Sequence, residues 1–156
     1  MTKLKDKAAI VGIGETEYSK NSGMSNLALL LQAAKRAIED SGLTTKDIDG
    51  VIPGFIGISA EHLISNFGLA DLRYTATVHI GGASAVASLQ TAAMAIATGI
   101  AHNVVCLIGW NGYSGMRPGA VGTRVETLPP LPMMSNLREF EMPFGSFVPA
   151  HWFAPL

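Results

Sequence analysis

The chain has 156 residues, of which 48% are hydrophobic and only 15% are charged, and its formal net charge is -1. One folded domain with a substantial core is expected at this length. A near-neutral charge gives no electrostatic reason to bind nucleic acid or an anionic membrane. The single cysteine, Cys106, excludes an internal disulfide and favours a reducing, cytoplasmic setting.

No secretory leader and no membrane span are predicted. The first seven residues are charged and lead directly into an apolar run. No Asp, Glu, Lys or Arg occurs between Arg73 and Arg117, but glycines, Gln90, His102 and Asn103 break the apolar runs in this interval. The helix expected there is rich in Ala and Ser rather than Leu, which favours a buried segment over a transmembrane helix.

Strands and helices alternate in the first part of the chain. Residues 7–14 have the pattern of a buried strand that ends in a tight turn. Ser25 is placed to cap a helix that runs to about Asp40 and closes at Ser41-Gly42. A second strand is expected over residues 51–58, where Pro53-Gly54 bends it or ends it early.

The same alternation continues through the middle of the chain. A short amphipathic helix is predicted over residues 60–67, and a third strand over residues 73–80. A charge-free helix over residues 83–99 and a fourth strand over residues 103–110 follow. The β-α-β-α-β-α-β order predicts an α/β fold with a mostly parallel sheet and helices on its faces.

A region of different character follows the fourth strand. Residues 112–149 are rich in Gly, Pro and Met, and the sequence then ends on an apolar, aromatic stretch. We therefore expect two parts: a core over residues 1–111 and, over residues 112–156, the start of a loop or lid that is truncated.

The helix over residues 83–99 is the candidate site-bearing element. It has no charged or aromatic residue from Ser84 to Thr98, a pattern typical of a helix buried on every side. Its start follows Gly81-Gly82, so free backbone N–H groups and the positive end of the helix dipole meet there. Such a place suits an anion or an oxyanion.

The candidate site residues are therefore the first residues of that helix and the histidine just before it: Gly82, Ala83, Ser84 and His79. Ser84 is either a first-turn capping residue or a nucleophile for which no adjacent base can be named. His79 either reaches the helix start or is a core histidine that bonds to the backbone, and the pattern favours the second role.

Other motifs indicate ordinary structural roles. Gly12-Ile13-Gly14 does not complete the dinucleotide-binding pattern, because Glu17 stands where the third glycine would fall. The histidines are not spaced for a metal site, so no metal is expected. Cys106 lies among Val, Leu and Ile, as a small buried hydrophobic residue does.

Two stretches resemble proteins of the thiolase superfamily, of the sterol-carrier-protein-X and lipid-transfer type. Ala-Ile-Val-Gly-Ile-Gly-Glu-Thr-Glu-Tyr at 9–18 is similar to their N-terminal strand and turn. Residues 81–90 and 97–109 are similar to the thiolase nucleophile helix and the strand after it. The resemblance implies the N-terminal half of a five-layered αβαβα fold, with this central helix buried between two sheets.

The resemblance also shows a departure from the thiolase pattern. Aligned back from Gly99, the acyl-accepting cysteine of thiolases falls at Gly82, while Ala83 and Ser84 match and Ala85 replaces a family glycine. Glycine cannot form a thioester, so ordinary thiolysis or Claisen condensation is not available. The acid and base residues of thiolases lie in the C-terminal half, which is not in this sequence.

The Gly-Gly-Ala-Ser version resembles a cysteine-less branch that includes retro-aldolases of steroid side-chain degradation. That resemblance implies a coenzyme A thioester substrate, no covalently bound cofactor, and C–C cleavage of a β-hydroxy- or β-ketoacyl-CoA rather than acyl transfer. It also implies a small OB-fold, zinc-ribbon-type partner and a homodimer through the strand from Arg73 to Ile80. The alternatives are a non-catalytic acyl-CoA- or lipid-binding or scaffold subunit, and an inactive fragment.

Overall fold

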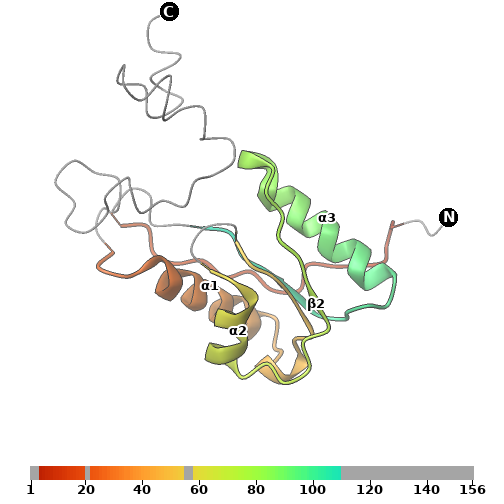
Figure 1. Cartoon of the computed structure of the whole chain (residues 1–156), viewed down its shortest axis with the longest axis horizontal. Helices are drawn as coiled ribbons and strands as arrows, with labels where there is room; N and C mark the ends of the chain where they lie inside the picture. The colour runs from red at the N-terminus through yellow and green to blue at the C-terminus, as the bar shows by residue number, and fades with distance from the viewer. Residues whose placement is uncertain (1–3, 20–21, 55–57, 110–156) are drawn as a thin grey trace, which may run out of the picture. The chain divides into compact units, whose positions relative to one another are not determined.

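A parallel sheet organises the part of the chain that the structure describes, which is residues 4–19, 22–54 and 58–109 of a computed structural model (Figure 1). Its three strands are β1 (Gly50–Ile52), β2 (Tyr74–Thr75) and β3 (Val104–Cys106), in the order β2-β1-β3. Gly50 lies opposite Tyr74 on one side and opposite Val104 on the other. The predicted α/β fold with a parallel sheet is confirmed, whereas the predicted loop or lid over residues 112–156 lies outside the described residues.

The helices begin and end at their local sequence signals. Helix α1 (Asn26–Asp40) is capped by Ser25, whose hydroxyl accepts a hydrogen bond from the N–H of Ala28 at 3.2 Å. Helix α2 (Ala60–Phe67) ends at Gly68, which has a left-handed φ of 65°. Helix α3 (Ser84–Ala97) follows a short 3-10 turn, η2 (Gly81–Ala83), and another such turn, η1 (Thr45–Asp47), precedes β1. All three predicted helices are confirmed.

The hydrophobic core lies where α1 and α2 pack on the central strand. Every residue of β1 is buried, as expected for the middle strand of a parallel sheet. The core cluster draws its side chains from α1, α2, β1 and the segments that flank the strands: Leu30, Ala34, Ile38, Ile48, Val51, Ile58, Leu63, Leu69 and Leu107. This core holds the sheet in place, and α3 packs on that sheet.

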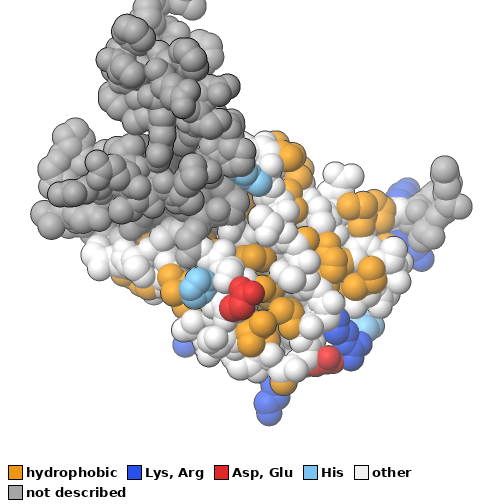
Figure 2. Space-filling model, in the orientation of Figure 1, with side chains coloured by type: hydrophobic (Ala, Val, Ile, Leu, Met, Phe, Trp, Pro, Cys, Tyr) orange, Lys and Arg blue, Asp and Glu red, His pale blue; other side chains and the backbone are white. Residues whose placement is uncertain are grey.

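Helix α3 packs on the sheet through its small residues and exposes three of its large ones, Val86, Leu89 and Met94. Its buried residues are Ser84, Ser88, Ala92 and Ala95. Val86 and Leu89 are 71% and 45% exposed, and Figure 2 shows hydrophobic side chains gathered over this helix. The expectation of burial on every side is therefore met on one side only, because no second layer among the described residues covers the other side.

Residues 7–14 do not form the predicted buried strand. They take part in no ladder of the sheet, and Ile10 and Val11 are 67% and 62% exposed. The prediction was wrong because an apolar run becomes a strand only where a neighbouring edge accepts its hydrogen bonds. In the structure this segment lies against a helix instead.

Glycines hold that segment against α1. A Cβ added to Gly12 would overlap the carbonyl oxygen of Ala37, and one added to Gly14 would overlap that of Ala33. The N–H of Ile13 also donates to Oδ2 of Asp40 at 2.8 Å. Gly12 and Gly14 therefore serve close packing on a helix, and not the phosphate-binding turn whose pattern they fail to complete.

The other predicted strands are shorter than expected. Within residues 73–80 only Tyr74–Thr75 pair, and of the described residues 103–109 only Val104–Cys106 do so. The strand predicted over residues 51–58 begins at Gly50 and stops at Ile52, because Pro53 cannot donate to a ladder. None of the helices within the described ranges is long and apolar enough to cross a membrane.

Candidate active site

The candidate site is built on the turn that leads into α3. Gly81 has a left-handed φ of 67°, which lets the chain reverse tightly before the helix. The Ser84 hydroxyl accepts from the N–H of Ile80 at 3.0 Å and donates to the carbonyl oxygen of Gly81 at 2.7 Å. Ser84 is only 2% exposed, so its hydroxyl fixes the shape of the turn and is not presented as a nucleophile.

Gly82 and Ala83 are the exposed residues of this turn. A Cβ added to Gly82 would meet nothing within 4 Å, so open space lies directly over the helix start. The N–H of Ser84 already donates to the carbonyl oxygen of Gly81. The N–H groups of Gly82 and Ala83 are therefore the ones that could meet a negatively charged oxygen, with the helix dipole behind them.

His79 belongs to the same segment, three positions before Gly82, and is half-buried. The four predicted site residues therefore lie on one continuous stretch that follows β2 and ends at the first residue of α3. Gly82, Ala83 and Ser84 belong to one turn, which is closed by the hydrogen bonds that Ser84 makes with Ile80 and Gly81.

A second polar group, missed from the sequence, lies at the start of α2. The ring Nδ1 of His62 accepts from the N–H of Ser59 at 3.1 Å and is 3.2 Å from the Ser59 hydroxyl. A hydrogen bond from Ser59 holds the pKa of Glu61 below its usual value. Helix α2 follows β1 as α3 follows β2, so both helices begin beyond the carboxyl ends of parallel strands, where α/β proteins bind ligands.

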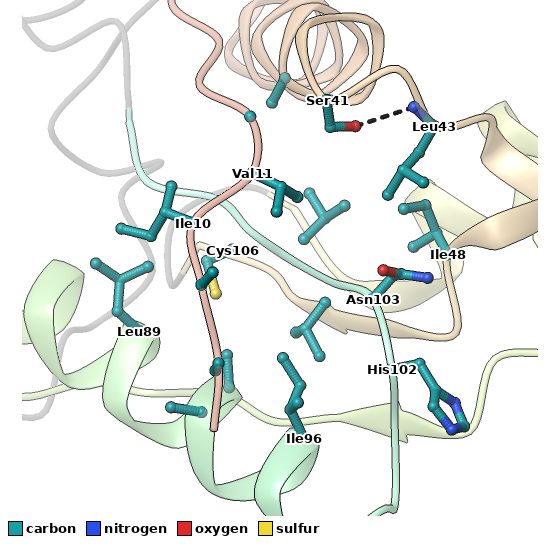
Figure 3. Close-up of a pocket in the computed structure, with 18 of the residues that line it drawn as sticks. Ile10, Val11, Ser41, Leu43, Ile48, Leu89, Ile96, His102, Asn103 and Cys106 are labelled. Atoms are coloured by element: carbon teal, nitrogen blue, oxygen red, sulfur yellow. Dashed lines mark hydrogen bonds between the residues drawn. The ribbon is translucent and has the colours of Figure 1, made fainter. Parts of the chain in front are cut away.

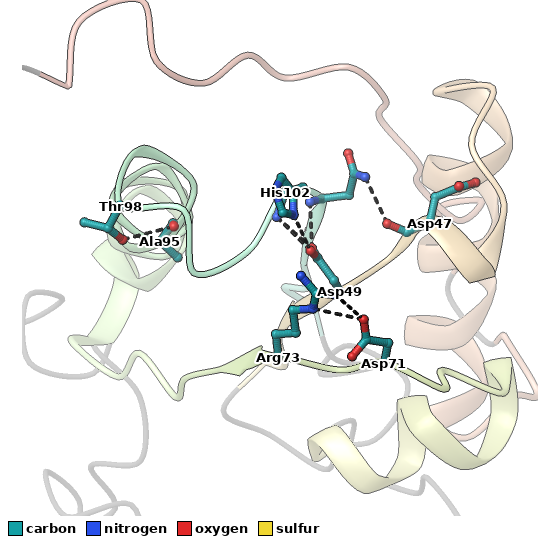
Figure 4. A network of polar contacts seen from close by, with 8 residues as sticks. Asp47, Asp49, Asp71, Arg73, Ala95, Thr98 and His102 are labelled. Atoms are coloured by element: carbon teal, nitrogen blue, oxygen red, sulfur yellow. Dashed lines mark hydrogen bonds and ion pairs between the residues drawn. The ribbon is translucent and has the colours of Figure 1, made fainter.

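The opposite, amino edge of the sheet is held by a buried carboxylate (Figure 4). Asp49 is 9% exposed, and its side chain accepts from the N–H groups of His102 and Asn103, each at 2.8 Å. Its Oδ2 also lies 2.8 Å from Nδ1 of His102. The carbonyl oxygen of Asp49 accepts from the N–H of Arg73 at 2.8 Å, so this one residue connects the starts of all three strands.

The hydrogen bonds keep Asp49 ionised. Burial of the carboxylate opposes ionisation, but the hydrogen bonds from Asn103 and His102 together outweigh it and hold the pKa of Asp49 below its usual value. No sequence pattern predicted a role for Asp49. A sequence signal for this network does exist: Asp49 stands directly before one apolar strand, and the pair His102-Asn103 stands directly before another.

Cys106 is half-buried on β3, with its Sγ 3.7 Å from the carbonyl oxygen of Ser88. Burial raises the pKa of its thiol to about 11. Cys106 (Figure 3) is therefore half-buried rather than buried as predicted, and its thiol is almost entirely protonated near neutral pH.

We expect opposite thiol reactivities at position 82 and at Cys106. A cysteine introduced by Gly82→Cys should react with a disulfide reagent at pH 8 more than about tenfold faster than Cys106, because it is exposed and lies at a helix N-terminus. Absorbance of the released thiolate measures both rates, and the unaltered chain supplies the rate of Cys106. Equal rates would contradict the open space over Gly82.

Two curated proteins are similar to this chain over almost all of its length. A steroid side-chain-cleaving aldolase of Thermomonospora curvata is 41% identical over 99% of the chain. A 17-hydroxy-3-oxo-4-pregnene-20-carboxyl-CoA lyase of Mycobacterium tuberculosis is 40% identical over 94% of it. The chain spans 39% and 38% of the lengths of these relatives. No protein-family model matches the chain.

Solved structures identify the fold. An Ltp2-ChsH2(DUF35) aldolase structure superposes with a TM-score of 0.73 at 38% identity, covering 94% of this chain and 36% of that one. A monomeric SCP2-thiolase-like protein from Mycobacterium smegmatis gives a TM-score of 0.51 at 25% identity, over 75% of this chain and 26% of that one. The fold is thiolase-like.

Proposed function

We propose that this chain is part of an enzyme that cleaves a carbon–carbon bond in the side chain of a steroid acyl-CoA. The observation that supports this proposal is the similarity, at 41% and 40% identity over nearly the whole chain, to an aldolase and a CoA-thioester lyase that act on steroid side chains. The open helix start at Gly82, which has no nucleophile, agrees with chemistry that needs no acyl-enzyme.

The proposed reaction is a retro-aldol cleavage of a β-hydroxyacyl-CoA. A base takes the proton of the β-hydroxyl, the bond between the α and β carbons breaks, and the β carbon becomes a ketone. The electron pair passes to the α carbon and the thioester oxygen, and the resulting enolate takes up a proton to give the shortened acyl-CoA. The charge on the thioester oxygen is what the N–H groups of Gly82 and Ala83 would stabilise.

The residues of this chain are proposed to bind and orient the thioester. Ser84 holds the turn through its two hydrogen bonds, and the N–H groups of Gly82 and Ala83 are proposed to face the open space beside Gly82, with the helix dipole behind them. His79 is proposed to lie at the base of that space. The general base is proposed to come from polypeptide outside the described residues.

Two partners are proposed with this function. One is a small OB-fold, zinc-ribbon-type protein, in keeping with the two-component name of the similar Ltp2-ChsH2(DUF35) aldolase. The other is a second copy of the chain, joined along the segment from Arg73 to Ile80. Strand β2 lies at an edge of the sheet in this segment, and such an edge can accept another strand.

A product assay tests the proposal. The complete protein, with and without the candidate partner protein, is incubated with 17-hydroxy-3-oxo-4-pregnene-20-carboxyl-CoA, and 17-ketosteroid and propionyl-CoA are followed by chromatography. We expect both products in equal amounts without added free coenzyme A. A reaction that requires free coenzyme A would instead indicate thiolysis. Binding of the substrate with no product under either condition would overturn the proposal in favour of a non-catalytic subunit.

A further inference from the structure

The peptide unit between Gly81 and Gly82 carries both the Gly81 carbonyl oxygen and the Gly82 N–H of the candidate site. In a trans peptide these two groups point in opposite directions, and the described residues contain no cis peptide bond. The Gly81 carbonyl oxygen is directed at Ser84, from which it accepts the backbone N–H and, at 2.7 Å, the hydroxyl. The N–H of Gly82 therefore points away from Ser84 and from the body of α3.

The glycine pair by itself allows this peptide unit two orientations. A half-turn of the peptide plane changes ψ of Gly81 and φ of Gly82 together, and glycine adopts either sign of φ. Gly81 has a φ of 67°, whereas Gly82 is not among the glycines with a positive φ. After a half-turn the carbonyl oxygen would take the place of the Gly82 N–H and would repel the oxygen of an enolate there. A group outside the pair must therefore select the observed orientation.

The Ser84 hydroxyl is that group. It accepts from the N–H of Ile80 at 3.0 Å, which leaves its own proton to donate to the Gly81 carbonyl oxygen. Ser84 is 2% exposed, so water cannot readily replace the hydroxyl. A half-turn of the peptide would break both bonds from Ser84 to Gly81 and would leave a buried hydroxyl donor without its acceptor.

We propose that Ser84 is a positioning residue, which holds the Gly81–Gly82 peptide so that the Gly82 N–H faces the thioester oxygen of the substrate. Its effect on catalysis rests on the proposed function, whereas the orientation of the peptide rests on the hydrogen bonds of the turn. Ser84 acts only through the peptide unit that it holds. Its hydroxyl should affect kcat more than KM, because the Gly82 N–H is needed most when negative charge forms on the thioester oxygen.

Ser84→Ala in the complete protein tests this role by kinetics and by crystallography. We expect kcat for the C–C cleavage to fall about tenfold with little change in KM, because most molecules then hold the peptide in the reversed orientation. A crystal structure of the variant should show the Gly81 carbonyl oxygen turned away from residue 84.

Thr91→Val is the matched control. It removes another hydroxyl from the same helix, one that donates to the carbonyl oxygen of Ala87 at 2.8 Å. Valine keeps the branched shape of threonine, so kcat, KM and the direction of the Gly81 carbonyl oxygen should all stay as in the unaltered protein.

The double variant Gly82→Ala/Ser84→Ala separates positioning from a general loss of structure. Alanine disfavours the positive φ that the reversed peptide needs at position 82, and a Cβ there meets nothing within 4 Å. When residue 82 is already alanine, we therefore expect Ser84→Ala to lower kcat by about twofold at most and to leave the direction of the carbonyl oxygen unchanged.

Two results would overturn the role of Ser84. One is a Gly81 carbonyl oxygen that keeps its direction in Ser84→Ala, and the other is an equal loss of kcat whether residue 82 is glycine or alanine. Failure of the proposed function looks different, because the unaltered protein would then release no ketone, while the crystal structures would still report the orientation of the peptide.

Discussion

Asp49→Ala is expected to lower the free energy of unfolding by about 3 kcal/mol. The substitution removes the acceptor of the N–H groups of His102 and Asn103 and the partner of the His102 ring, all at the amino edge of the sheet. Those N–H groups would be left without their acceptor beside the core. Urea denaturation followed by circular dichroism measures the change. Asp49→Asn keeps the shape of the side chain and one acceptor oxygen, so it should lower the free energy of unfolding by about half as much as Asp49→Ala.

Asp71→Ala is the control for this prediction. The Asp71 carboxylate forms an ion pair with the Arg73 guanidinium at 2.6 Å, but both side chains are largely exposed. Ion pairs of this kind contribute little to stability, so the unfolding midpoint should scarcely move. Equal effects of Asp49→Ala and Asp71→Ala would contradict the role given to Asp49.

The contribution of Asp49 should depend on pH. Its folded-state pKa is lowered, so the carboxylate stabilises the fold above the pKa of an unfolded aspartate, about 3.9. That stabilisation is lost as the pH falls through the folded-state pKa. The difference in stability between the unaltered chain and Asp49→Asn should therefore be full at neutral pH and shrink in acid.

Gly82→Val is expected to reduce kcat/KM for the proposed C–C cleavage by about 10²- to 10³-fold. Nothing lies within 4 Å of a Cβ at this position, so the valine side chain would occupy the open space over the helix start without disturbing the fold. It would keep a thioester oxygen away from the N–H groups of Gly82 and Ala83. Initial rates of ketone release from the steroid acyl-CoA measure the effect.

Gln90→Val controls for the addition of a branched side chain to α3. Gln90 is exposed and lies about two turns from the helix start. Gln90→Val should leave both the activity and the unfolding midpoint unchanged, whereas Gly82→Val should leave only the unfolding midpoint unchanged. Full activity in Gly82→Val would remove the helix start from the proposed mechanism.

The helices could be predicted from the sequence because their signals are local. Ser25 caps α1 through a bond to a residue three positions away, and Gly68 ends α2 where a left-handed residue is needed. The small residues of α3 likewise gave its position to within two residues at either end. The turn at Gly82, Ala83 and Ser84 was located by the same kind of local pattern.

The candidate site was predicted only in outline. The sequence left Ser84 as either a capping residue or a nucleophile, and its buried position with two hydrogen bonds to the turn decides for the structural role. The space over Gly82 also became visible only in three dimensions. Whether a side chain faces solvent or is used within a turn depends on atoms that a residue pattern does not place.

Pairing across long sequence distances was decided by the tertiary structure alone. Residues 7–14 have a strand-like composition, yet no edge receives them here, and Asp49 bonds to residues 53 and 54 positions away. The sequence by itself determined the α/β class, the helices and the glycine turn before α3, because caps, glycines and apolar periodicity act over a few residues. Which strands pair, which face of α3 is buried and which carboxylate holds the sheet depend on contacts between distant segments, and only the folded chain brings those together.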